Sequence, residues 1–184
     1  MIAVEGSNRP DQIEKLKRLK LPVTVLKKET FDGMGEWVAD LGKALGEEKL
    51  ANKARDRWDF EVRALEPGTT TTSIFLELQS RPLVTIGGGS FMTAAFKRVG
   101  LHNIFEDLAQ DYPKVSREAV MKLNPDQIWI LDLNGDPLQF EKSQREWERL
   151  DSLKAVKDGH VRVVKGDDFA RCSMRLLNAL KKLK

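Results

Sequence analysis

Charged side chains that suit anion binding follow an apolar, strand-like segment near the C-terminus. Asp167, Asp168 and Arg171 lie in the stretch KGDDFAR, and Arg175 comes four residues after Arg171. Residues four apart share one side of a helix, so Arg171 and Arg175 could receive an anionic group together. The alternative is a solvated loop capped by its own arginines. Because neighbouring side chains diverge, Asp167 and Asp168 are not expected to face one ligand.

Three consecutive glycines, Gly87–Gly89, follow another strand-like segment and precede a helical pattern. Backbone N–H groups at such a turn can approach an anion at the start of a helix. A dinucleotide fingerprint, however, requires a further glycine where Met92 stands, and the Gly-Lys-Ser/Thr of a phosphate-binding loop is absent. We favour a tight structural turn, with nucleotide binding as the alternative.

The remaining reactive residues predict no catalytic machinery. His102 and His160 lie beside turn residues, without the partners of a metal site or a nucleophilic triad. Cys172 is the single cysteine, which excludes an intrachain disulfide. Tyr112 is the only tyrosine and precedes a proline in an irregular segment, where an aromatic side chain is often a contact residue.

The second half of the chain alternates strands with helices, which predicts a parallel sheet. Strands are expected over residues 72–78, 128–132 and 161–164, and the nearly continuous apolar run 128–132 is typical of a strand covered on both faces. Helices are expected over 90–99, after Ser116 as an N-cap, over 138–150 and over 173–183, whereas 103–113 is read as irregular and 165–172 as a loop. In such sheets, ligands bind beyond the carboxyl ends of the strands, which here continue into QSRPLVTIGGG, DLNGDP and KGDDFAR.

Residues 30–65 carry apolar side chains at three- and four-residue steps and predict two helices in series, 31–45 and 47–65. Thr30 is the expected N-cap of the first helix, and Gly46 separates the two. A strand, helix and strand over 2–4, 10–20 and 22–26 precede this block. We therefore predict a spine helix between two α/β lobes, with an ordinary crossover helix inside one sheet as the alternative.

Composition points to a globular protein. Lys and Arg total 31 against 28 Asp and Glu, which gives a net charge of +3. Because residues of both signs are interspersed along the chain, the charge argues against a nucleic-acid partner. No apolar run approaches the roughly 20 residues that span a bilayer, and Met1 leads directly into a strand-like segment instead of an export signal.

Three segments of the second half contain the motifs Val-Ser-Arg-Glu and KGDDFAR: residues 74–108, 111–131 and 147–183. Together they resemble the C-terminal lobe of class III ABC-transporter substrate-binding proteins of the cobalamin, haem and ferric-siderophore type. Residues 1–65 resemble the end of that family's N-terminal lobe and its spine helix. The resemblance implies three segments: a remnant of the N-terminal α/β lobe at 1–30, a helical segment at 31–65 and a complete C-terminal α/β lobe at 66–184.

The implied function is non-catalytic capture of a metal chelate, namely cobalamin, haem or a ferric siderophore, and its delivery to an ABC permease in the membrane. No intrinsic cofactor or metal site is implied. Glu118 matches a glutamate that pairs with permease arginines, and it also suits a helix N-terminus. The positions that match ligand contacts are Val4, Asn8, Val84, Tyr112, Asp167, Phe169 and Arg171. Valine at positions 4 and 84, where cobalamin binders tend to carry aromatic rings, does not favour cobalamin over a siderophore.

The resemblance also implies truncation, since the family's first two βα units, roughly 30 residues each, have no counterpart here. We expect a periplasmic or cell-surface location, although this chain carries no export signal. We also expect an open edge of the N-terminal sheet through which a homodimer could form. The alternatives are a binding-incompetent remnant that oligomerises and, less favoured, a nucleotide-binding α/β domain that uses Gly87–Gly89.

Overall fold

The computed structural model describes residues 1–5, 8–65, 71–133, 135 and 137–183. The chain divides into two compact units, Met1–Ala64 and Leu65–Lys184, which are described separately here as unit 1 and unit 2. Turns are expected from the sequence at 5–8 and at 66–68; the second lies outside the described residues, as do parts of the first and of the segment DLNGDP.

Unit 1 begins with a strand, a helix and a strand. β1 (Ile2–Val4) pairs in parallel with β2 (Thr24–Leu26), and α1 (Pro10–Arg18) connects them. Pro10 occupies the first helical position, where its missing N–H costs nothing. Ala3, Ile13 and Leu26 are buried, whereas the apolar stripe expected over Ile13, Leu16 and Leu19 is only partly enclosed, because Leu19 is 61% exposed.

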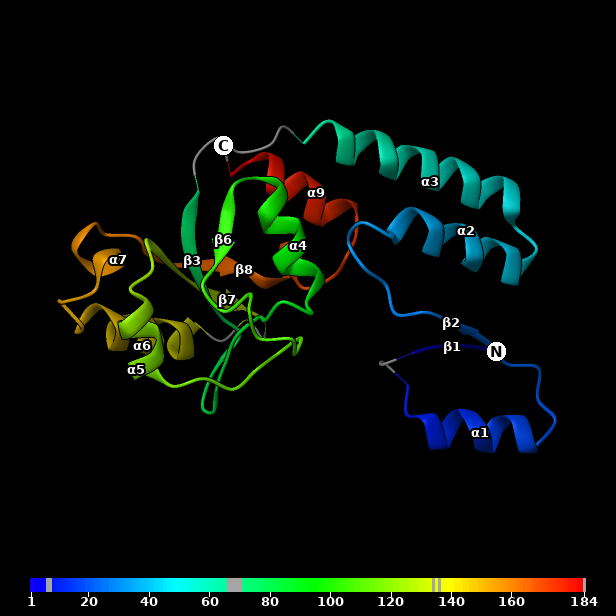
Figure 1. Ribbon diagram of the computed structural model, residues 1–184, viewed down its shortest axis with the longest axis horizontal. Helices are drawn as coiled ribbons and strands as arrows, with labels where there is room; N and C mark the ends of the chain where they lie inside the picture. Colours follow the sequence, from blue (N-terminus) through cyan, green and yellow to red (C-terminus); the bar gives the residue numbers. More distant parts are fainter. Residues whose placement is uncertain (6–7, 66–70, 134, 136, 184) are drawn as a thin grey trace. The chain divides into compact units, whose positions relative to one another are not determined.

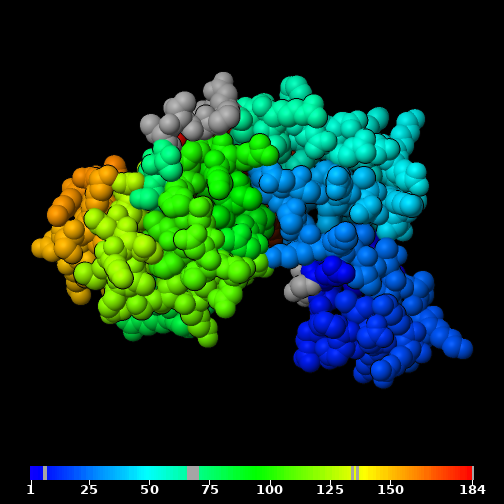
Figure 2. All heavy atoms as spheres, in the orientation of Figure 1, coloured from blue at the N-terminus to red at the C-terminus, as the bar shows by residue number. Residues whose placement is uncertain are grey.

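Two closely packed helices complete unit 1 (Figure 1): α2 (Met34–Leu45) and α3 (Glu48–Arg63). The predicted break at Gly46 is confirmed, because this residue caps α2 at a φ of 73°. A Cβ atom on Gly42 would lie 2.1 Å from that of Ala51, so glycine permits the close approach of the helices, whose atoms touch in Figure 2. The N-cap prediction is wrong: Gly33 precedes α2, and Thr30 instead accepts the Gly33 N–H within the preceding turn.

Unit 2 is built on a four-stranded sheet in the order β6-β3-β7-β8, in which all pairs are parallel. The three predicted strands are confirmed as β3 (Thr72–Glu77), β7 (Gln127–Asp132) and β8 (Val161–Lys165). β6 (Leu101–Asn103) was not predicted, because three residues beside a turn carry too little periodicity. A two-stranded antiparallel hairpin, β4 (Gln79–Ser80) and β5 (Leu83–Val84), follows β3 and contains a cis Arg81–Pro82 bond.

Helices cover both faces of this sheet (Figure 1). On one face, Phe75 packs edge-on against Trp147, in a core that also holds Val120, Phe140 and Ala155. Val120 belongs to α5 (Arg117–Leu123), Phe140 and Trp147 belong to α6 (Pro137–Glu148), and Ala155 belongs to α7 (Lys154–Lys157). On the other face, Trp129 packs against Phe96 of α4 (Phe91–Arg98) and Phe169 of α8 (Gly166–Phe169). The chain ends with α9 (Met174–Lys181), which buries Leu176, Leu177 and Leu180.

Candidate ligand-binding edge of unit 2

The carboxyl ends of three strands meet at one edge of the unit 2 sheet. Glu77 of β3 pairs in register with Ile130 of β7, and Asp132 of β7 pairs with Lys165 of β8. Because these strands are parallel, the segments that follow them begin at the same edge. This edge is where open α/β sheets bind ligands, and it gathers the hairpin that carries Val84 with the loop that carries Asp167 and Arg171.

The hairpin places Val84 beside the segment that carries Tyr112. Val84 pairs with Gln79 on one side and bridges to Lys114 on the other. The next residue, Thr85, donates its backbone N–H to the carbonyl oxygen of Pro113 at 3.1 Å. Val84 is half-buried, whereas Tyr112 keeps 50% of its surface exposed on this hydrogen-bonded backbone. The structure therefore brings these two predicted contact residues onto neighbouring segments.

The three glycines serve a close backbone approach. Gly87 and Gly88 donate their N–H groups to the carbonyl oxygens of Asp111 and Leu108, at 2.9 and 2.7 Å. A Cβ atom on Gly88 would lie 2.1 Å from the carbonyl oxygen of Glu106. Because two donors of the run are already used, the geometry supports the structural turn and disfavours the nucleotide-binding alternative.

The segment after β8 contains the short helix α8, so the prediction of a continuous loop over 165–172 is wrong. Gly166 begins α8 directly against β7, where an added Cβ would lie 2.2 Å from the carbonyl oxygen of Asp132. Phe169 is only 5% exposed, and its ring lies 5.8 Å from those of Phe96 and Trp129. Its packing explains why the sequence places an aromatic residue between polar neighbours, and a ligand contact by Phe169 stays a prediction.

Asp167 and Arg171 flank this buried ring and are both exposed, whereas Asp168 is half-buried. The two adjacent aspartates therefore differ in exposure. The prediction that Arg171 and Arg175 share one helical face is wrong, because α9 begins only at Met174 and Arg171 lies outside it. A phenylalanine anchored in the core thus holds a short segment that presents a carboxylate and a guanidinium to solvent.

Val4 and Asn8 belong to unit 1 and lie at the carboxyl end of β1. The side-chain oxygen of Asn8 accepts the backbone N–H of Val4 at 2.8 Å, and the Asn8 N–H donates to the Val4 carbonyl at 3.0 Å. Asn8 is therefore held at the carboxyl end of β1 through its side-chain oxygen.

Glu118 lies in the first turn of α5 and is exposed. Ser116 caps this helix as predicted, since its hydroxyl accepts the Ala119 N–H at 3.2 Å. Hydrogen bonds from the backbone N–H of Glu118 and from the Ser116 hydroxyl lower the pKa of Glu118 below its ordinary value, against a smaller desolvation effect. The residue therefore presents a stable negative charge at a helix N-terminus.

Sequence reasoning missed a charged network on α5 and α6. Glu146 accepts a hydrogen bond from Arg81 of the hairpin at 3.0 Å and one from Arg117 at 2.5 Å. Desolvation opposes the charge of Glu146, but the hydrogen bond and charge of Arg117, together with the charges of Arg81 and Lys142, hold its pKa below the ordinary value. Arg81 and Arg117 lie 65 and 29 residues from Glu146 in the sequence, so no local sequence pattern could predict these pairs.

Glu77, at the end of β3, was also missed. It is 2% exposed and accepts hydrogen bonds from the Ser143 hydroxyl and, at 2.5 Å, from the indole N–H of Trp147. The available signal was a glutamate inside the apolar run IFLEL, two residues after Phe75 and thus on the same sheet face.

Two features are absent from the part of the chain that the structure describes. No group of three or more His, Cys, Asp or Glu residues in this part of the chain is placed to hold a metal ion. None of its helices combines the length and apolarity that crossing a membrane requires.

Comparison with known proteins identifies the family. Residues 2–167 match the family described as "Periplasmic binding protein". A vitamin B12-binding protein of Vibrio parahaemolyticus is 25% identical over 183 residues, which cover 98% of this chain and 65% of that protein. Two solved structures share the fold at a TM-score of 0.80. The periplasmic vitamin B12 binding protein of Vibrio cholerae is 24% identical, and the match covers 99% of this chain and 71% of that one. A periplasmic haem-binding protein of Roseiflexus is 15% identical, and the match covers 99% of this chain and 72% of that one.

The chain belongs to the periplasmic binding protein family, since the match extends over most of its length. The α/β fold class and the family expected from the sequence resemblance are both confirmed. These relatives are binding proteins, not enzymes. The chain spans about two thirds of the length of the curated relatives, 65% in the comparison quoted above.

Proposed function

We propose that the chain is the substrate-binding component of an ABC importer for a metal chelate, with cobalamin, haem and a ferric siderophore as the candidate ligands. One observation carries this proposal: the sheet of unit 2 gathers the Val84 hairpin and the Asp167–Arg171 segment at its carboxyl edge. Relatives of the same family are named for vitamin B12 and haem. Family members are periplasmic, and we propose the same location here.

The proposed contacts divide by chemistry. Tyr112 offers an exposed ring for a flat macrocycle, whereas Asp167 and Arg171 offer charged groups for a polar substituent. Val84 completes the surface of unit 2 beside Tyr112. Val4 and Asn8 are the proposed contacts of unit 1, and Phe169 of α8 acts by anchoring the segment that carries Asp167 and Arg171.

A thermal-shift screen of the purified chain tests this function. Cobalamin, haem, several ferric siderophores and nucleotides should be compared, because a ligand that binds only the folded protein raises its melting temperature. Stabilisation by one chelate class supports the proposal and names the substrate. Stabilisation by nucleotides alone, or by no compound, contradicts it.

Arg171 provides a finer test of ligand charge. Arg171→Ala should weaken an anionic chelate about tenfold or more and a neutral corrin much less, since a charge-assisted hydrogen bond is lost only in the first case. Arg145→Ala, which removes an exposed arginine of α6 that pairs with Glu141, is the matched control. Equal losses for both ligands would reject the role of Arg171.

We further propose that Glu118 contacts the permease. Its carboxylate is exposed and ionised, which suits pairing with arginines of a membrane partner. Glu118→Ala should weaken binding to the cognate permease in nanodiscs and leave chelate affinity unchanged, whereas Asp107→Ala, at another exposed acid, should change neither. A changed chelate affinity would argue against docking.

The second candidate is a self-associating protein with little ligand affinity. It is favoured by unit 1, where β1 pairs with β2 alone among the described strands and where Met1 and Ile2 are 60% and 39% exposed. Light scattering after size-exclusion chromatography distinguishes a dimer from a monomer. If a dimer forms through this edge, Ile2→Lys should dissociate it, because a charge blocks edge-to-edge pairing. A monomeric wild-type chain removes this candidate.

A further inference from the structure

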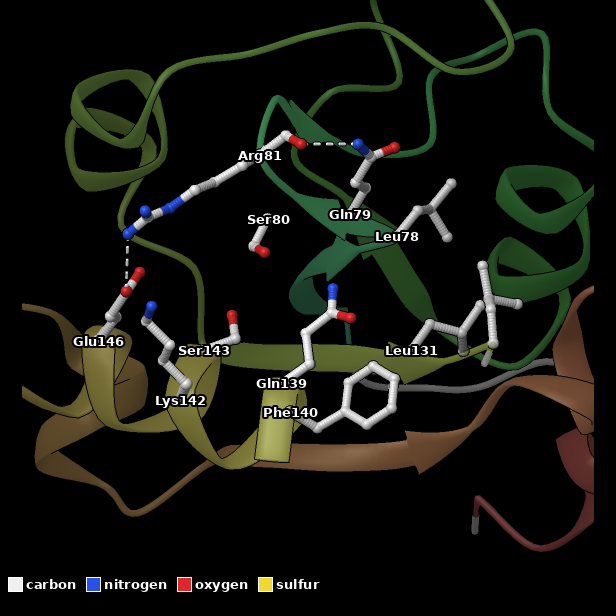
Figure 3. A pocket seen from close by; sticks show the side chains of 11 residues that line it. Leu78, Gln79, Ser80, Arg81, Leu131, Gln139, Phe140, Lys142, Ser143 and Glu146 are labelled. Carbon is white, nitrogen blue, oxygen red and sulfur yellow. Dashed lines mark hydrogen bonds and ion pairs between the residues drawn. The ribbon is translucent and has the colours of Figure 1, made fainter. Parts of the chain in front are cut away.

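A cavity of about 570 Å³ lies inside unit 2, between the β4–β5 hairpin and α6 (Figure 3). It lies at the carboxyl ends of β3 and β7, where Leu78 and Leu131 line it, and its size falls within the roughly 300–1,000 Å³ of small-molecule sites. Val84, Tyr112, Asp167 and Arg171 do not line it. The cavity therefore shares the β4–β5 hairpin with the proposed chelate site but none of its proposed contact residues.

The two ends of the cavity differ in chemistry. Leu78, Leu131 and Phe140 form an apolar end, and Arg81, Lys142 and Glu146 form a charged end opposite them (Figure 3). A ligand that fills this space must carry an apolar body and a polar head. A uniformly polar molecule would leave Leu78 and Leu131 without apolar contacts, and a uniformly apolar one would cover charged groups without giving them partners.

The charged end favours an anionic head. Glu146 is shared by two arginines: Arg81 donates to one of its carboxylate oxygens and Arg117 to the other. Arg117 also lies over the ring of Trp147, outside the cavity lining. Three cations, Arg81, Arg117 and Lys142, thus act on the single carboxylate of Glu146, so this end of the cavity carries an excess of positive charge.

Both cations retain donors for a ligand. Only one nitrogen of Arg81 is bonded to Glu146, and a guanidinium carries five N–H donors. The Lys142 side chain lies beside Glu146 in Figure 3, and among the described residues it acts on that carboxylate through its charge, without a direct hydrogen bond. Two cations from different elements thus converge on one end of the space.

The wall that carries Lys142 is held rigidly. Its neighbours on α6, Ser143 and Trp147, both donate to the buried carboxylate of Glu77 at the end of β3. Phe140, which lies three residues before Ser143 on α6, is 8% exposed and packs into the core. A wall fixed in this way loses little conformational freedom when a ligand binds.

We propose that this cavity binds a small amphipathic carboxylate, such as a short fatty acid or an aromatic acid, with its apolar body against Leu78, Leu131 and Phe140 and its carboxylate between Arg81 and Lys142. The site needs no contribution from unit 1, and it does not depend on the function proposed above. It would give the chain a second ligand class beside a metal chelate.

Nuclear magnetic resonance titration of the whole chain tests the proposal. Benzoate and hexanoate are the probes, and benzamide and hexanamide are their neutral counterparts of similar shape. Saturable shifts of the β4–β5 hairpin and α6 signals are expected for both acids, with about tenfold or more weaker binding of the amides, since charge-assisted hydrogen bonds are lost. Inorganic phosphate, which lacks the apolar body, should bind more weakly than benzoate.

Variants of opposite sign sharpen the test. Arg81→Gln and Lys142→Gln should each weaken benzoate about tenfold, whereas Arg145→Gln, on the same helix but outside this cavity, should not change its affinity. Glu146→Gln removes the competing carboxylate and should strengthen benzoate binding several-fold. Three results would overturn the proposal. Neither acid gives saturable shifts, the amides bind as tightly as the acids, or both Arg81→Gln and Lys142→Gln leave benzoate binding unchanged.

Discussion

The two units are both built from parallel strands, but they differ in how far those strands are enclosed. In unit 2, β3 has a partner strand on each side, and the opposite sheet faces bury Phe75 and Trp129 under helices. In unit 1, β1 pairs with β2 alone among the described strands. Ile2, in β1, and Leu19, just after α1, remain 39% and 61% exposed.

This difference indicates where the chain can hold side chains in fixed positions. A strand bonded on both edges and covered on both faces leaves its following loop little freedom, and the Val84 hairpin begins from such a strand, β3. The α8 segment follows the edge strand β8 and is fixed instead by the buried ring of Phe169. A pair of strands alone is only marginally stable. In unit 1, the closest packing is instead between α2 and α3, where Gly42 meets Ala51. The predictions below test this contrast.

The largest effect is expected in the core of unit 2. Phe75 is fully buried and contacts the rings of Phe105 and Trp147. Phe75→Ala should lower the free energy of unfolding by about 3–5 kcal/mol, because it leaves a cavity among rings that cannot collapse. The matched change in unit 1, Phe60→Ala at a 70% exposed side chain, should stay within about 0.5 kcal/mol. Urea denaturation followed by circular dichroism measures both, and comparable losses would remove the contrast between the units.

Glycine substitutions test close packing in each unit. Gly88→Ala, in unit 2, would press a methyl group onto the carbonyl of Glu106, and Gly42→Ala, in unit 1, onto the methyl group of Ala51. Each change should cost about 1–3 kcal/mol, because backbone or helix must move apart. Thermal unfolding of both variants gives the comparison. A neutral Gly42→Ala would show that α2 and α3 are less tightly packed than their geometry indicates.

Asp126 makes the stability of unit 2 depend on pH. Hydrogen bonds from Lys154 and from the hydroxyl and N–H of Ser73 lower the pKa of Asp126 from 3.8 to about 2. A lowered pKa stabilises the fold above the unfolded-state value and loses that contribution as pH falls through about 2. Because Asp126 is partly exposed, we expect Asp126→Asn to cost about 1–2 kcal/mol at neutral pH.

The cost of Asp126→Asn should shrink as pH falls from 4 towards 2, and chemical denaturation at a series of pH values measures it. Asp11→Asn, at a carboxylate of unit 1 whose side chain is 64% exposed, is the control and should show little cost at any pH. A cost of Asp126→Asn that does not change over this range would reject the role of its charge.

The smallest effect is expected on the open surface of unit 1. Leu50 is 65% exposed on α3, beside an apolar groove that it forms with Val38 and Leu41 of α2. Leu50→Gln should change the free energy of unfolding by less than about 0.5 kcal/mol, since little apolar surface leaves the interior. Leu177→Gln, at a fully buried position of α9, should destabilise the protein severely. A large loss for Leu50→Gln would show that this surface is covered.

Much of the architecture could be predicted because its signals are local. The apolar run 128–132, the cap at Ser116 and the stop at Gly46 each depend on residues within one element, and the structure confirms all three. The errors lie where elements are short. β6 and α8 contain three and four residues, too few to display a period, so 101–103 was not predicted as a strand and 165–172 was predicted as a loop throughout.

The sequence by itself determined the alternation of strands and helices, the parallel sheet of unit 2 and the segments that follow its strands, because hydrophobic periodicity and capping act over a few residues. Only the tertiary structure decided what those segments do. It buries Phe169 between Asp167 and Arg171, uses the Gly87–Gly89 run for backbone contact, and joins Arg81 to Glu146 across 65 residues. These outcomes depend on contacts between distant parts of the chain, which packing alone selects.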